Sequence, residues 1–360
     1  MLKVHRSSHL RLRDAFHLNT LKNRVLRDTP DMMVDVKLSN SRSFMYNETN
    51  NPNLVSDSID TVEKVNISRL FSLIANPLPS QFAYFTAPLV NFSNQVLQDL
   101  NLKNHVSIWI SSRDCVTRAH YDTLENHFVQ VDGKKRFKIW DPTQHFNLQV
   151  FPDSHPRARK SQIDLCAPVD DAQFLLYQGL EAPILDAVLK PGDSITIPSF
   201  YFHQVETLDE PSVSINTFSS STTAGIASRI FSAASHAKSL EELHRFIPSI
   251  LKHSVGVDPA IFLQKMLLSR FRIPLSVCNI PDSKLAKKNS EPKNGYDVAL
   301  WTDYFATLRI HCDDISPEYS QGVVEIVASH LCELLVVRSQ GADKVCATLE
   351  RIAQEIHFNN

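Results

Sequence analysis

The central part of the chain alternates short runs of β-branched and aromatic residues with Pro, Gly and Asp. The runs lie at 106–110, 127–131, 136–140, 185–189, 194–197, 204–207 and 213–218. Each run has the length of a strand and is bounded by residues that favour turns. Many short strands separated by turn signals are typical of a sandwich or a barrel, so we expect one mainly β domain in this region.

The flanking regions show other patterns. Residues 29–65 are polar and predict short strands and loops, and helical spacing appears at 67–74 and 89–100. After residue 225 apolar residues recur at helical spacing, which predicts helices at 226–250, 261–267, 298–308, 323–337 and 342–356, with a polar loop at 281–294. We therefore divide the chain into a flanking region (1–75), a β domain (76–222) and a helical domain (223–360).

The clearest local prediction is a hairpin at Asp132-Gly133, because Asp-Gly favours a two-residue turn in which both residues have positive φ. Such a turn would place Gln130 opposite Lys135. Side chains alternate between the faces of a strand, so one face carries the following residues: Phe128, Gln130, Lys135, Phe137 and Ile139. This face is the more apolar one, and we expect it to be the interior.

Lys135 is unusual on such a face. Burial of an unpaired ammonium is unfavourable, and no acidic residue shares this face of the hairpin. One interpretation is that Lys135 binds an anionic ligand. The other is that it reaches solvent at the rim or pairs with a distant carboxylate. Asn126 has the same parity as Phe128 and should also point inward, and Asn216 is a polar residue within the last β run.

Three residues are candidate metal ligands. His120 and Asp122 form an H-x-D pair, and His203 follows among aromatic residues at the start of a predicted strand. Two imidazoles and one carboxylate form the facial triad of non-haem Fe(II) oxygenases, which leaves other coordination positions open. Each residue also has an ordinary alternative, since H-x-D occurs by chance and a lone histidine is commonly hydrogen-bonded within a core.

Composition excludes several classes. The formal net charge of the 360 residues is −2, which gives little electrostatic attraction to nucleic acid or anionic lipid. We expect no membrane helix, because no apolar run approaches about 18 residues. The six cysteines are scattered without a C-x-x-C pair, which favours a reducing intracellular compartment, cytoplasmic or nuclear. The first 28 residues contain seven Lys or Arg and two Asp. An N-terminal helix is the favoured interpretation over a mitochondrial targeting segment.

The chain resembles the JmjC and cupin-like 2-oxoglutarate oxygenases, most of all the asparaginyl hydroxylases of the factor-inhibiting-HIF type. Residues 117–126 match T-x-A-H-Y-D-x-x-x-N, and residues 130–136 match Q-x-x-G-x-K-R. An H-P…S-Q-I-D pattern follows between 155 and 164, and P-G-D…I-P…H ends at His203. The resemblance is specific over about residues 80–220.

The resemblance implies a double-stranded β-helix, or jelly roll, with a helical C-terminal domain. It also implies Fe(II) on His120, Asp122 and His203. The residues implied to bind the cosubstrate 2-oxoglutarate are Thr117 and Lys135 at its distal carboxylate, with Asn126 and Asn216 lining the pocket.

The implied activity is O₂-dependent hydroxylation of a protein side chain. The alternatives are an N-methyl-lysine demethylase, a tRNA-base hydroxylase and a non-catalytic cupin scaffold. Phe202 and Gln204 flank the distal histidine and Phe218 replaces a family Trp. We expect these departures to lie on the substrate side, so the asparaginyl substrate is not carried over.

The helical C-terminal region carries an apolar stripe that needs a covering surface. It comprises Val323, Ile326, Val327, Leu331, Leu334 and Leu335. Two-fold homodimers are the commonest oligomers, and such a stripe suits their interfaces, so we predict a homodimer through these helices. The alternative is a monomer in which the stripe packs within the chain.

Overall fold

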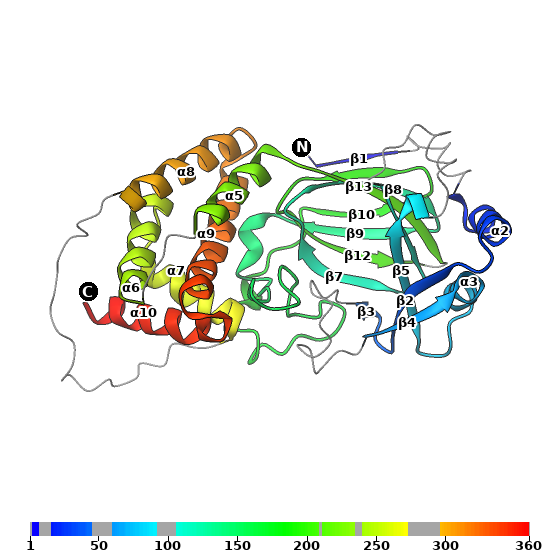
Figure 1. Cartoon of the computed structure of the whole chain (residues 1–360), viewed down its shortest axis with the longest axis horizontal. Helices are drawn as coiled ribbons and strands as arrows, with labels where there is room; N and C mark the ends of the chain where they lie inside the picture. The colour runs from blue at the N-terminus through cyan, green and yellow to red at the C-terminus, as the bar shows by residue number, and fades with distance from the viewer. Residues whose placement is uncertain are drawn as a thin grey trace. The chain divides into compact units, whose positions relative to one another are not determined.

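The computed structural model describes residues 2–6, 16–44, 60–91, 106–208, 211–234, 240–272 and 296–359 (Figure 1). These residues form two compact units. The β unit comprises 1–140, 164–167 and 182–221, and the helical unit comprises 141–163, 168–181 and 222–360. The three-part division expected above remains a prediction.

Two sheets make up the β unit. The larger sheet has the order β1 (Lys3–His5), β11 (Ser194–Ile197), β8 (Glu125–Asp132), β13 (Ser212–Ser219), β6 (Val106–Ser111), β5 (Phe82–Pro88), β2 (Met33–Ser39) and β4 (Asp60–Asn66). The smaller sheet has the order β10 (Leu185–Leu189), β9 (Lys135–Trp140), β12 (Phe202–Thr207), β7 (Val116–Tyr121) and β3 (Ser43–Phe44). All pairings are antiparallel except that of β3 with β7, which is parallel. The mainly β fold with large antiparallel sheets is that of a jelly roll, as expected (Figure 1).

The predicted hairpin is wrong, because its two strands belong to different sheets. β8 pairs with β11 and β13, whereas β9 pairs with β10 and β12. Gly133 does adopt the positive φ expected of the turn, at 66°. A Cβ there would lie 2.5 Å from the carbonyl oxygen of Pro211. The Asp-Gly turn therefore carries the chain from one sheet to the other, and strands distant in sequence supply the pairing.

The larger sheet is apolar on the face that points away from the other sheet. This outer face packs against α2 (Leu18–Asp28) and α3 (Ile67–Ala75). The shared core contains Leu21, Val25, Leu70, Ile74, Ile108, Ile110, Val129, Val131, Val213 and Ile215. The expected N-terminal helix thus forms, and it contributes to this core. Positions 10 and 12 of that expected helix and residues 92–105 lie outside the described residues.

The inner face of the larger sheet carries the residues expected inside, Phe128 and Gln130, but it is more polar than expected. On β8, Asn126 and Gln130 face the same way as Phe128, while Val129 and Val131 belong to the outer core. The interior of this strand is therefore its more polar face. The expected interior is confirmed in the smaller sheet as well, since Lys135, Phe137 and Ile139 are all buried.

The helical unit contains α5 (Thr222–Ala233), α6 (Leu240–Ser249), a π-helical turn (Ile250–Val255), α7 (Pro259–Met266), a second π-helical turn (Leu267–Phe271), α8 (Tyr296–Asp313), α9 (Pro317–Gln340) and α10 (Val345–Asn359). Short 3₁₀ turns cover Leu89–Asn91, Pro142–His145, Tyr177–Gly179 and Ala342–Lys344. The polar loop expected at 281–294 lies outside the described residues. The expected helices otherwise appear, with extended ends.

The apolar stripe of α9 is buried inside the helical unit. Val323, Val327 and Leu331 have no exposed surface, and α9 contacts α5, α6, α8 and α10. Gly322 lets α9 approach the Pro142–His145 turn, since a Cβ there would lie 2.3 Å from the Thr143 nitrogen. The stripe therefore gives no support to a homodimer, which stays a prediction without this basis.

α9 is an exception to the expectation that no apolar segment is long enough to span a membrane. Among the described helices, α9 alone is long enough and apolar enough to span a membrane. However, 72% of its most apolar 18-residue segment is buried in the protein. This burial is what a core helix of a folded domain shows.

Candidate metal centre

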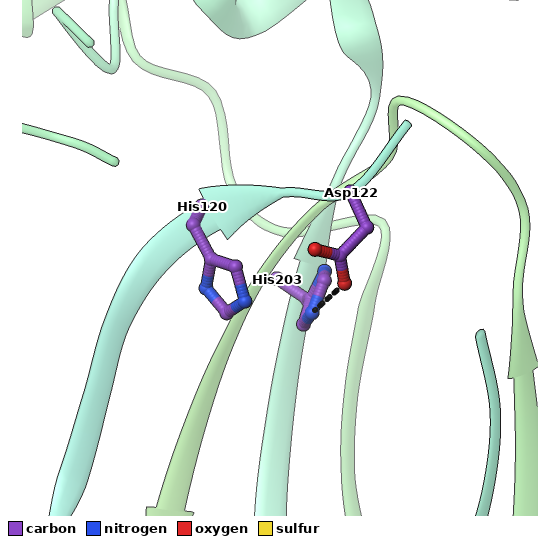
Figure 2. A group of neighbouring side chains, drawn as sticks. All are labelled: His120, Asp122 and His203. Atoms are coloured by element: carbon purple, nitrogen blue, oxygen red, sulfur yellow. Dashed lines mark ion pairs between the residues drawn. The ribbon is translucent and has the colours of Figure 1, made fainter. Parts of the chain in front are cut away.

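His120, Asp122 and His203 lie together at one end of the smaller sheet. His120 is directly opposite His203 on the neighbouring strands β7 and β12, with ring centroids 4.2 Å apart. Asp122 follows the end of β7, where its carbonyl accepts a hydrogen bond from the Phe200 nitrogen at 2.7 Å. One ligand atom from each side chain lies within 4.8 Å of the others, and all three point into a common space (Figure 2).

The hydrogen bonds of the two imidazoles suit metal binding. The Nδ1 atom of His120 lies 2.8 Å from the Arg118 carbonyl oxygen, and that of His203 lies 3.2 Å from the Tyr201 carbonyl oxygen. Carbonyl groups only accept, so each Nδ1 carries the proton and each Nε2 keeps its lone pair. The Nε2 of His203 faces Asp122 Oδ2 at 3.7 Å (Figure 2). The donor set therefore fits a divalent metal with imidazole and carboxylate ligands.

A β-bulge places Thr117 on the same side of β7 as His120. The two residues are three positions apart, and strict alternation would put them on opposite faces. The pairing steps from His203–His120 to Val205–Thr117, so β7 has one extra residue in this interval. Such a bulge re-aims the side chains next to it. Thr117 and His120 therefore both point into the interior, although they are three positions apart in the sequence.

Lys135 is buried in the interior with 2% of its surface exposed. Its Nζ donates to Ser214 Oγ across the two sheets at 3.0 Å, and it lies 5.5 Å from the Phe128 ring centroid. Burial lowers the pKa of Lys135 to about 7, and the Cys115 thiol opposes this shift. Within the part of the chain that the structure describes, no carboxylate forms an ion pair with Lys135.

Tyr84 contacts two of these residues, Thr117 and Lys135, and the sequence pattern did not single it out. The Thr117 hydroxyl donates to the Tyr84 hydroxyl at 3.3 Å, and the Tyr84 ring centroid lies 5.9 Å from Lys135 Nζ. Burial raises the pKa of Tyr84, so the phenol keeps its proton. Tyr84 lies on β5, outside the recognised motifs, and only the pairing of β5 with β6 brings it to Thr117. The sequence feature that could have indicated Tyr84 is the alternation of side chains along residues 82–88, which places it on one face of a strand.

Asn126 and Asn216 are hydrogen-bonded to each other on neighbouring strands of the larger sheet. The Asn216 Nδ2 donates to Asn126 Oδ1 at 2.9 Å, and both residues are buried. All seven predicted site residues thus lie on inner faces or at the end of β7. Contacts such as Lys135–Ser214 and Thr117–Tyr84 join the two sheets around them.

The residues that depart from the family pattern separate into two groups. Phe202 and Gln204 have the opposite parity to His203 and face away from the interior, so they do not lie on its ligand side. Phe202 instead packs edge-on against Tyr121, with centroids 5.2 Å apart. Phe218 shares the parity of Asn216, lies opposite Asn126, and is 37% exposed at the end of β13.

Comparison with known proteins gives a family and several partial relatives. A family model described as a cupin-like domain matches residues 17–223. JmjC domain-containing protein D of Dictyostelium discoideum is 29% identical over 114 residues, covering 31% of this chain and 25% of that protein. The tRNA wybutosine-synthesizing protein 5 of Danio rerio is 31% identical over 110 residues, covering 30% of this chain and 31% of that protein.

A third relative is the bifunctional lysine-specific demethylase and histidyl-hydroxylase NO66 of Drosophila persimilis. It is 29% identical over 136 residues, which cover 38% of this chain and 15% of that protein. The chain therefore spans less than a third of the length of each of these relatives. The X-ray structure of E. coli ycfD aligns with a TM-score of 0.36 and 14% identity, covering 89% of this chain and 66% of that chain. Because the family model covers more than half of the 360 residues, this chain belongs to the cupin-like domain family, and its partial relatives include JmjC proteins.

Proposed function

We propose that this chain is an Fe(II)- and 2-oxoglutarate-dependent dioxygenase that hydroxylates a protein side chain. The observation that carries the proposal is the combination of two features in one barrel. One is the His120–Asp122–His203 cluster, in which the Nδ1 atoms of both histidines bond to backbone carbonyls, and the other is a buried lysine with no described carboxylate partner. A scaffold without a ligand has no use for either feature, because both are unfavourable when left unfilled.

Each set of residues has a separate role in this proposal. His120, Asp122 and His203 would hold Fe(II), and the Arg118 and Tyr201 carbonyls orient the two imidazoles. Fe(II) with bound 2-oxoglutarate and O₂ supplies oxidative decarboxylation of the cosubstrate coupled to oxidation of the substrate.

The residues proposed to bind the cosubstrate are all buried. Lys135 would pair with the distal carboxylate, with Thr117 adding a hydroxyl beside it, and Asn126 and Asn216 would line the pocket. The buried surroundings of Lys135 exclude water, which strengthens its attraction for an anion.

Two other activities follow from what the relatives are called, namely lysine demethylation and wybutosine synthesis in tRNA. The net charge of −2 gives a tRNA substrate little electrostatic support. The direct test is succinate release by the full chain with Fe(II) and 2-oxoglutarate, across unmodified peptides, methyl-lysine peptides and tRNA. Turnover only with methyl-lysine peptides or only with tRNA would replace the proposed substrate class and keep the cosubstrate.

Metal binding is tested by substitution. His120→Ala and Asp122→Ala are expected to lose bound Fe(II) and turnover, because each removes a ligand. His127→Ala is a matched control, since His127 is a β8 residue that faces outward and bonds to Thr196 Oγ1 at 2.8 Å. Metal content of the purified variants gives the answer without an activity assay. Full iron retention in both ligand variants would reject this site.

A further inference from the structure

A chain of three hydrogen-bonding side chains crosses the inner face of the larger sheet. The Trp109 Nε1 donates to Asn216 Oδ1 at 2.7 Å, and Asn216 Nδ2 donates to Asn126 Oδ1 at 2.9 Å. The three residues come from β6, β13 and β8, which are adjacent in the sheet. The family resemblance assigns a role to the two asparagines and none to Trp109.

The direction of this chain follows from the chemistry of the indole. An indole N–H can only donate, so it selects the amide orientation of Asn216 in which the oxygen faces Trp109. The Asn216 amide nitrogen must then face Asn126, whose oxygen accepts from it. The Asn126 Nδ2 is left as a donor, and no described side chain or backbone group accepts from it.

Trp109 also packs against Tyr84 in the interior of the β unit. Its ring centroid lies 5.9 Å from that of Tyr84, whose hydroxyl accepts from Thr117. The indole is partly exposed, whereas its strand neighbours Ile108 and Ile110 are fully buried in the outer core. Trp109 therefore lies on the polar inner face, in contact with Tyr84 beside Thr117 and with Asn216.

We propose that Trp109 is a positioning residue for the anionic cosubstrate. Its N–H locks the Asn216 and Asn126 amides in the orientation that presents the Asn126 N–H₂ to an oxygen of the ligand. Without the indole donor both amides can rotate, and the pocket loses the preorganisation that favours an acceptor. This inference rests on the proposed function, since it takes 2-oxoglutarate as the ligand.

The test compares Trp109→Phe with Trp140→Phe in the full-length protein loaded with Mn(II). Trp140 is a matched control because it lies in the same unit on the outward face of β9. Calorimetry measures the dissociation constant of 2-oxoglutarate. Trp109→Phe is expected to weaken binding by about fivefold, the range for one net hydrogen bond, and Trp140→Phe to leave it unchanged.

A double-mutant cycle separates positioning from a general loss of stability. If Trp109 acts through Asn126, Trp109→Phe has no further effect on the dissociation constant in an Asn126→Ala background. An effect of the same size in both backgrounds would overturn the proposal, as would wild-type affinity in Trp109→Phe. Failure of the wild-type protein to bind 2-oxoglutarate would overturn the proposed function and this inference together.

A second measurement covers the case in which Trp109→Phe does not fold. In the wild-type protein loaded with diamagnetic Zn(II), the indole ¹⁵N–¹H resonance of Trp109 is expected to shift when 2-oxoglutarate binds. That of Trp140 is expected to stay in place. An unmoved Trp109 resonance at saturating 2-oxoglutarate would show that the hydrogen bonds from Trp109 through Asn216 to Asn126 are not affected by the ligand. This result would reject the proposal.

Discussion

Two buried cations, one in each unit, have opposite surroundings. Arg270 in the helical unit lies 2.5 Å from Asp153 Oδ2 and 2.7 Å from Glu333 Oε1. Lys135 in the β unit has a hydroxyl at 3.0 Å, and no carboxylate pairs with it among the described residues. Both side chains are almost completely buried. The helical unit therefore contains a cation whose charge is balanced by carboxylates, whereas the described residues around Lys135 provide no carboxylate.

The difference agrees with the proposal that Lys135 binds an anionic ligand, whereas the partners of Arg270 give it a structural role. Glu333 also accepts hydrogen bonds from the backbone nitrogens of Asp153 and Ser154, so the Arg270 cluster joins α9, a π-helical turn and the 141–163 segment. Burial raises the pKa of Glu333 to about 7, and Arg270 opposes that rise. A buried cation left without such partners is unfavourable for folding and is retained where a ligand needs it.

The largest expected effect is that of Arg270→Met. The substitution leaves Asp153 and Glu333 buried without their cation, and loss of one partner of a buried ion pair typically costs about 3–5 kcal/mol. We expect the free energy of unfolding to fall by this amount, measured by urea denaturation. A change below about 1 kcal/mol, the range of exposed ion pairs, would show that the cluster is accessible to water and not structural.

Lys135→Met is expected to act in the opposite direction. The pKa of Lys135 falls from 10.5 in the unfolded chain to about 7 in the fold. The native state thus binds fewer protons, and the unfavourable effect of Lys135 on stability is fully present below pH 7 and disappears above pH 10.5. At neutral pH the methionine variant should be more stable by a few kcal/mol, up to about 4.

The same variant should lose cosubstrate binding. The apparent KM for 2-oxoglutarate is expected to rise by an order of magnitude or more, because truncating a buried charge pair costs ~2–5 kcal/mol. Metal content should stay normal, since Lys135 is no metal ligand. A variant that is less stable than wild type and still binds 2-oxoglutarate would make Lys135 a structural residue like Arg270 and remove the contrast between the units.

The pH dependence of 2-oxoglutarate binding sharpens the contrast further. Because burial lowers the pKa of Lys135 to about 7, the ammonium form, which is the one proposed to bind the anion, dominates below this pH. The dissociation constant should be flat below pH 7 and rise up to about tenfold for each pH unit above it. Burial raises the pKa of the neighbouring Cys115 to about 11, so this thiol stays neutral over the range. Lys135→Arg, whose guanidinium stays charged, should bind weakly but without this dependence.

The smallest predicted effect is that of Ser214→Ala. Ser214 Oγ accepts from the Lys135 ammonium at 3.0 Å, so its loss removes the hydrogen bond that stabilises the charged form. The pH above which 2-oxoglutarate affinity declines should move down by roughly half to one unit, as one hydrogen bond is worth about 0.5–1.5 kcal/mol. Ser212→Ala is the control, because Ser212 Oγ accepts from Gln130 Nε2 instead. An equal shift in both variants would point to a general change in the sheet.

Local signals predicted the elements well and their partners poorly. The strands at 185–189 and 194–197 have the bounds expected from their apolar runs and turn residues. The Asp132-Gly133 turn also has the expected positive φ at glycine, yet β8 and β9 part into different sheets. Turn chemistry depends on two residues, whereas sheet pairing depends on strands more than 50 positions away, such as β11 and β12.

Residue types and alternation on single strands thus determined much of the candidate site, namely the two histidines, the aspartate and the inward Lys135. Apolar spacing also predicted the helices after residue 225. Tertiary structure decided which face of the larger sheet is apolar, because α2 and α3 cover the side opposite the pocket. The β-bulge that places Thr117 on the side of His120 also depends on tertiary structure. The same holds for the contacts of Tyr84 with Thr117 and of Trp109 with Asn216, and for the burial of the α9 stripe within the helical unit. The physical reason is that a side chain's chemistry and local alternation are properties of a few neighbouring residues. Burial and hydrogen-bond partners are set by contacts between segments far apart in the chain.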